Sequence, residues 1–95
     1  MSIVDKILRR KRPDAPTRRQ RLLAGGRITD GVILDSEINP VGEEIDFFLY
    51  TLNGDDFESS DILTDEQRLD PVKYAPGAKV GVRYDPKNQG NSIVE

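Results

Sequence analysis

The chain has 95 residues, contains neither cysteine nor histidine, and is 33% charged against 36% apolar. A chain of this length forms at most one domain with a modest core. The missing cysteines exclude disulfides and thiolate metal sites, and the missing histidines remove the commonest general base and transition-metal ligand. We therefore expect no enzymatic activity, no cofactor and no metal site.

Charge is divided unevenly along the chain. Residues 1–23 hold eight basic side chains against two acidic ones, whereas residues 24–95 hold six against fifteen, which gives balances of +6 and −9. Such a division informs about partners rather than about fold. No apolar run reaches the roughly 18 residues of a membrane span, and the basic cluster follows the first apolar residues, unlike a signal peptide. We expect a cytoplasmic protein, with peripheral contact at the inner membrane surface as an option.

The charge division predicts a basic amphipathic arm over residues 1–17 and an acidic β domain over residues 18–95. Residues 2–12 suit a short helix whose apolar residues recur at helical spacing before a basic run. A helix this short is marginal alone in water, so its apolar stripe requires a surface. The candidate surfaces are an anionic membrane, a protein partner or the acidic domain itself. The basic run could also contact nucleic-acid phosphates, and in the remaining alternative the segment stays disordered and solvated. The candidate tether residues are Ile3, Val4, Ile7, Leu8, Arg9, Arg10, Lys11 and Arg12.

Short-range signals predict the elements of the domain. Thr17 and Gln20 form a capping-box pattern for a helix over 18–24, and Gly25 or Gly26 is expected to end it in the left-handed conformation. Asn53-Gly54 favours a type I′ hairpin turn. A second capping box at Thr64 predicts a helical turn reaching Leu69. We expect strands at 27–36, with a bulge or bend at Gly31, and at 44–52, 55–61, 79–84 and 92–94, with a loop over 85–90.

Five short strands joined by tight turns indicate a mainly β fold. The expected architecture is a small five-stranded antiparallel barrel or rolled sheet, OB-like or SH3-like, with short N-terminal helices. Closing the sheet removes the exposed edges that an open sheet of this size would present. An open meander with a helix packed on one face is the alternative.

The predicted strand 44–52 is apolar on both faces, with Ile45, Phe47 and Leu49 on one and Phe48, Tyr50 and Leu52 on the other. Phe48 and Tyr50 are therefore candidate interface residues for a protein partner or a homodimer. In the alternative interpretation, the opposite wall of the barrel covers one face and the Leu22–Leu23 helix covers the other.

Two segments resemble a known family. Leu22-Leu23-Ala24-Gly25-Gly26 leads into Gly31-Val32-Ile33-Leu34, and a second segment, Pro76-Gly77-Ala78-Lys79-Val80-Gly81-Val82-Arg83-Tyr84-Asp85-Pro86, has a Pro-Gly turn, an alternating strand and a Tyr-Asp-Pro exit. Over about residues 20–95 the chain resembles the bacterial family called domain of unknown function 3592. The resemblance implies a small β domain and carries no activity and no catalytic residues.

These observations predict a non-catalytic binding or adaptor module. The acidic domain engages a protein partner, and the basic arm tethers it to that partner or to an anionic membrane surface. The alternative is a nucleic-acid accessory protein that binds phosphates through the arm. The acidic charge around the domain's aromatic residues opposes phosphate binding, which makes nucleic acid the less favoured partner.

Overall fold

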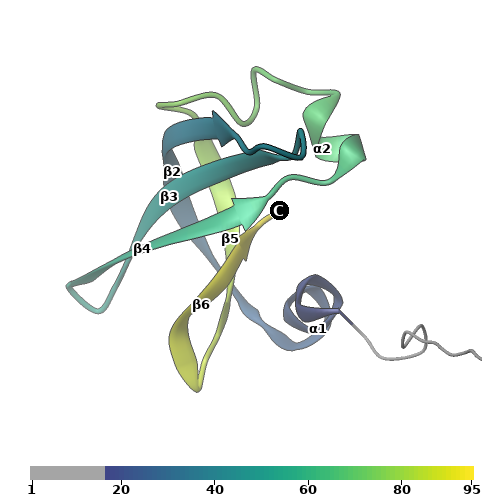
Figure 1. Ribbon diagram of the computed structural model, residues 1–95. Helices are drawn as coiled ribbons and strands as arrows, with labels where there is room; N and C mark the ends of the chain where they lie inside the picture. The colour runs from purple at the N-terminus through teal and green to yellow at the C-terminus, as the bar shows by residue number, and fades with distance from the viewer. Residues whose placement is uncertain (1–16) are drawn as a thin grey trace, which may run out of the picture.

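The computed structural model describes residues 17–95. These residues form a mainly β domain, as the sequence predicts (Figure 1). The elements are α1 (Arg18–Gly25), β2 (Arg27–Ile38), β3 (Glu44–Leu52), β4 (Asp55–Ile62), α2 (Asp65–Arg68), β5 (Lys79–Asp85) and β6 (Asn88–Val94).

The five strands form one antiparallel sheet in the order β4-β3-β2-β5-β6. The long strand β2 lies at the centre of the order because its first half pairs with β5 and its second half with β3. Gly31 and Val32 are paired on both sides, where the two halves overlap. The sheet curls until its edge strands β4 and β6 approach each other, which gives a nearly closed barrel (Figure 1).

The connectivity separates the two barrel types that the sequence left open. The first four strands lie in the spatial order fourth, first, second, third, which is a Greek key. A five-stranded, partly open Greek-key barrel is the OB architecture. The helical turn α2 lies between the third and fourth strands of this barrel. The fold is therefore OB-like, since in an SH3-like barrel the first strand lies between the second and the fifth.

The core fills the inside of the curled sheet. Its buried cluster consists of Ile33, Phe48, Tyr50, Leu52, Leu63, Tyr74, Val80, Val82 and Val94. The rings of Phe48, Tyr50 and Phe57 stack in sequence, with centroid separations of 5.9 and 5.5 Å. The Tyr50 hydroxyl donates a hydrogen bond to the backbone carbonyl of Gln89, which satisfies its polar end inside the barrel.

The predictions that rest on interactions between residues close in sequence are confirmed. Both capping boxes form, with Thr17 and Gln20 at α1 and with Thr64 and Gln67 at α2. Asn53 and Gly54 have φ values of 53° and 85°, as a type I′ turn requires.

The glycine at the end of α1 was assigned the wrong role. Gly26 has φ −77° and ψ 163°, so the chain leaves the helix in an extended conformation and continues directly into β2. A Cβ at Gly26 would lie 2.5 Å from the backbone carbonyl oxygen of Leu22. Glycine stands here because of that close approach, and not to supply a left-handed stop.

Two strand predictions also need correction. The bulge of β2 falls between Ile33 and Asp35 rather than at Gly31. Residues 88–90, predicted as a loop, belong to β6, because the chain reverses tightly after Asp85 and Asp85 pairs with Asn88.

Candidate interaction surface and polar seam

Phe48 and Tyr50 are not surface residues in this structure. Their side chains are 0% and 2% exposed, in the middle of the core. Both residues predicted as an interface therefore lie on the inward face of β3, where neither side chain is accessible to a partner. The prediction that these two residues form an interface is wrong.

The outward face of β3 carries the other apolar row. Ile45, Phe47 and Leu49 alternate with the buried residues and are half-buried. In the register of the sheet, Val32 on β2 is paired with Leu49, and Ile62 on β4 is paired with Ile45. Directly paired residues share a face. We call this set the apolar spine: Val32, Ile45, Phe47, Leu49 and Ile62.

No helix among residues 17–95 covers the apolar spine. The helix α1, expected over this face in one interpretation, instead lies against β5 and β6 (Figure 1). Its Leu22 is buried there, while Leu23 remains 39% exposed. That interpretation is therefore wrong for the outer side of β3. Ile62 is 48% exposed, and the bulge residue Leu34 is 42% exposed beside the spine.

Carboxylates border the apolar spine on both sides. On β2, Asp35 is paired with Phe47 and Glu37 with Ile45. On β4, Glu58 is paired with Leu49. Asp56 lies two residues earlier on β4, on the same face, and is paired with Thr51. These four residues are exposed. We call them the acidic border.

Basic side chains are missing from these three strands over a long stretch. Residues 28–67 contain twelve acidic residues and no lysine or arginine. The border ends on the β5 side, where Lys79 is paired with Val32. The gap in basic residues can be read from the sequence. The arrangement of an apolar row between two acidic rows cannot, because it depends on the register of three strands.

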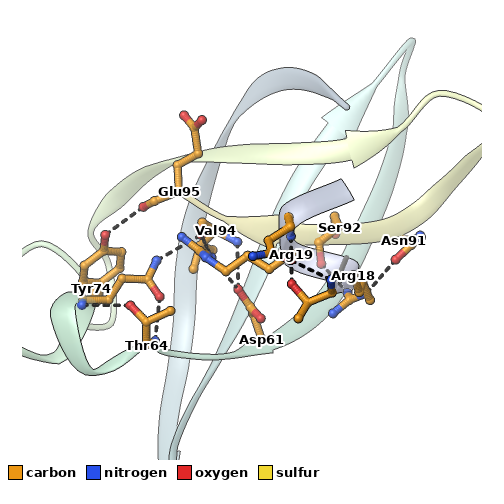
Figure 2. Close-up of polar contacts among 12 residues, drawn as sticks. Arg18, Arg19, Asp61, Thr64, Tyr74, Asn91, Ser92, Val94 and Glu95 are labelled. Carbon is orange, nitrogen blue, oxygen red and sulfur yellow. Dashed lines mark hydrogen bonds and ion pairs between the residues drawn. The ribbon is translucent and has the colours of Figure 1, made fainter. Parts of the chain in front are cut away.

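A polar seam joins the edge strands β4 and β6 beside α1 (Figure 2). The Arg18 guanidinium donates to the carbonyl of Ser92 and, at 2.7 Å, to Oδ1 of Asn91. Arg19 Nη1 donates to the carbonyl of Val94 at 2.9 Å. Side chains of the first helix thus satisfy backbone carbonyls of β6 that have no strand beside them.

Asp61 completes the seam from the β4 side. Its Oδ2 accepts a hydrogen bond from the Val94 backbone N–H at 3.2 Å and lies 3.6 Å from Arg19 Nη1. Burial raises the pKa of the Asp61 carboxyl above its ordinary value, and the Val94 N–H and Arg19 partly oppose that rise. Gln67 Nε2 donates to the Val94 carbonyl at 3.0 Å, and Tyr74 Oη donates to the Glu95 carbonyl at 2.8 Å (Figure 2).

Asp46 is a fully buried carboxyl on the inner side of β3. Its Oδ1 accepts from Ser36 Oγ at 2.7 Å, whereas its Oδ2 has no partner among the described residues. Desolvation raises the pKa of Asp46, the Ser36 hydrogen bond lowers it, and the negative charges of Glu44 and Asp61 raise it further. Nothing in the sequence indicates that this carboxyl is buried, because a polar residue at this position fits the alternation of a strand with one exposed face.

The predicted tether residues Ile3 to Arg12 lie outside the described residues. The first described residues lead into α1, where Arg18 lines a shallow surface hollow together with Ile45, Ser60, Asp61 and Ile62. The start of α1 thus reaches one end of the apolar spine through the Arg18 side chain.

No group of three or more carboxylates within residues 17–95 is arranged to hold a metal ion. None of the helices here is long and apolar enough to cross a membrane.

Comparisons with family models, with curated proteins and with solved structures found no match. The resemblance to the family called domain of unknown function 3592 accordingly stays a prediction.

Proposed function

We propose that this protein is a non-catalytic binding module whose apolar spine accepts a cationic, amphipathic segment of a protein partner. The supporting observation is the apolar row between two acidic rows on the outside of β2, β3 and β4. Neighbouring strands lie about 4.8 Å apart, so Leu49, Phe47 and Ile45 each have one carboxylate a strand away, on the β4 side for Leu49 and on the β2 side for the other two. A segment with an apolar face and basic flanks would satisfy both kinds of group at once.

The fold supports the choice of surface by analogy. OB barrels bind their ligands on the face of the second and third strands. Those strands are β3 and β4 here, and their outer face carries the spine. Fold alone does not define a ligand, so the partner's chemistry is inferred from the side chains on that face.

Those side chains argue against a nucleic acid as the partner of this face. OB barrels that bind single strands present a positively charged groove with aromatic platforms. The face of β3 and β4 presents the opposite charge, with no lysine or arginine between residues 28 and 67. Phosphate binding therefore falls to the basic arm, whose role as a tether to the partner or to an anionic membrane is the second part of the proposal.

The test uses the isotopically labelled full chain and two synthetic amphipathic helical peptides, one of leucine and lysine and one of leucine and glutamate. We expect the lysine peptide to shift backbone amide resonances along residues 45–49 and 58–62, with an affinity that falls as salt is raised. Stronger binding by the glutamate peptide, or resonance shifts confined to other strands, would exclude the proposed surface.

Charge reversal on the border supplies a matched pair of variants. Glu58→Lys places a positive charge beside Leu49, whereas Glu66→Lys changes an exposed carboxylate on α2, outside the spine. We expect Glu58→Lys to weaken binding of the lysine peptide by roughly three- to tenfold, as the loss and inversion of surface ion pairs implies. Glu66→Lys should stay within about twofold of the unmodified chain.

A further inference from the structure

The chain contains a segment with the chemistry that the apolar spine would recognise. We propose that residues 3–12 dock on the spine of the same molecule, so that the free protein covers its own binding surface and a partner must displace the arm. This inference rests on the proposed function, because it names the regulation of the same site. Three independent observations point to it: the position of the junction, the length of the arm, and the charges on the two surfaces.

The junction lies where docking requires it. Arg18, the first residue of α1, lines one hollow together with Ile45 and Ile62, which form one end of the spine. The described chain therefore begins within one arginine side chain of the apolar residues at that end of the spine.

The lengths agree. Ile45 and Leu49 are four residues apart on β3, a distance of about 14 Å at 3.4 Å per residue. The helix that the sequence predicts over residues 2–12 would be about 16 Å long at 1.5 Å per residue. Residues 13–16, which include Pro13 and Pro16, would span about 12 Å in an extended conformation. The arm can therefore turn back and lie along the spine without additional residues.

The charges are complementary. The arm carries four consecutive basic residues, Arg9 to Arg12, directly after its apolar residues. The acidic border presents four exposed carboxylates, two on each side of the spine. No lysine or arginine from residues 28–67 competes for those carboxylates. The apolar face of the arm and its basic run thus match the two components of the surface.

Covalent connection makes weak contacts sufficient. A short linker holds the arm at an effective concentration in the millimolar range. An arm that binds the spine with a millimolar dissociation constant would thus occupy it about half of the time. A partner segment must therefore compete with the tethered arm for the spine, which lowers the apparent affinity of the partner.

The absence of cysteine permits a direct measurement. Ser2→Cys introduces a single thiol, to which a nitroxide label is attached in the isotopically labelled full chain. We expect paramagnetic broadening of the amides of residues 45–49 and 58–62, and its loss at high salt or in a chain that also carries Glu58→Lys. The chain with Glu66→Lys should keep the broadening. Broadening that is absent from the spine, or spread evenly over the domain, would overturn the proposal.

A mixture distinguishes the arm of a second copy from docking in cis. Spin-labelled chains without the isotope are mixed with isotope-labelled chains without the spin label. We expect no broadening in this mixture. Broadening of the spine amides there would assign the occupant to a second molecule and would overturn docking in cis.

A final comparison separates this inference from the proposed function. Replacement of Ile3, Val4, Ile7 and Leu8 by serine should release the spine and tighten binding of the leucine–lysine peptide by at least twofold. Equal affinity for both chains would overturn self-docking and leave the proposed function standing. Spine broadening by the labelled arm, without peptide binding to the serine variant, would support self-docking and overturn the binding-module proposal.

Discussion

Gly31 is a position in the core at which a single added methyl group should strongly destabilise the fold. It lies at the centre of β2, paired with Tyr50 on one side and Val80 on the other. A Cβ there would lie 2.6 Å from Val82 Cγ2 and 2.9 Å from the Leu49 carbonyl oxygen. Val82 is 0% exposed within the buried cluster, and the carbonyl is part of the β3 backbone, so neither is the far end of a flexible surface side chain. We expect Gly31→Ala to lower the free energy of unfolding by about 3 kcal/mol, the upper part of the range for overpacked cores.

Gly81→Ala is the matched control for this substitution. Its Cβ would meet Glu95 Oε1 at 3.1 Å, the far end of a flexible side chain that can rotate away. Urea unfolding followed by circular dichroism should give a free energy of unfolding for Gly81→Ala within about 1 kcal/mol of that of the unmodified chain. Thermal melts should place the Tm of Gly31→Ala roughly 12–24 °C lower.

A double-mutant cycle tests the cause. Val82→Ala removes the atom that the new methyl group would meet, so the pair Gly31→Ala and Val82→Ala should be less destabilised than the sum of the two single variants by about 1 kcal/mol or more. Additive effects, or a Gly31→Ala chain as stable as Gly81→Ala, would refute the steric argument.

Two further predictions concern the buried carboxyl and the seam. Burial raises the folded-state pKa of Asp46 above its unfolded-state value. The free energy of unfolding therefore falls as pH rises from the unfolded-state pKa to the folded-state pKa, and above the folded-state pKa it falls no further from this group. Asp46→Asn should therefore stabilise the chain at pH 7 by about 1 kcal/mol, with the advantage shrinking towards pH 4 in urea titrations; a destabilised variant at pH 7 would contradict this. Arg19→Gln removes the hydrogen bond to the Val94 carbonyl and should cost about 1 kcal/mol. Amide exchange at Val94 should accelerate relative to that at Val82, and equal protection at both positions would count against the seam.

The sequence alone determined the features that depend on neighbours along the chain. Thr17 and Gln20 cap α1 because their side chains and backbone groups are three residues apart, whatever the remainder of the fold. Asn53-Gly54 makes its turn because these two residues tolerate positive φ. The bounds of β3 at residues 44 and 52 follow from a run rich in strand-favouring residues between turn signals. The five-stranded barrel class follows from the number and spacing of such runs.

Only the tertiary structure decided which side of each strand faces inward. Strand β3 is apolar on both faces, so its sequence offers no preference, and the choice depends on the summed packing of Phe48 and Tyr50 against residues far along the chain, such as Val82 and Val94. With this orientation of the strand, Phe47 lies half-buried on the outer face and Phe48 lies in the core. The same orientation places Phe47 between Asp35 of β2 and Ser60 of β4, a juxtaposition that no single segment encodes. Closure of the barrel likewise depends on Arg19, Asp61 and Val94, which are more than 30 residues apart in sequence and meet only after the sheet has curled.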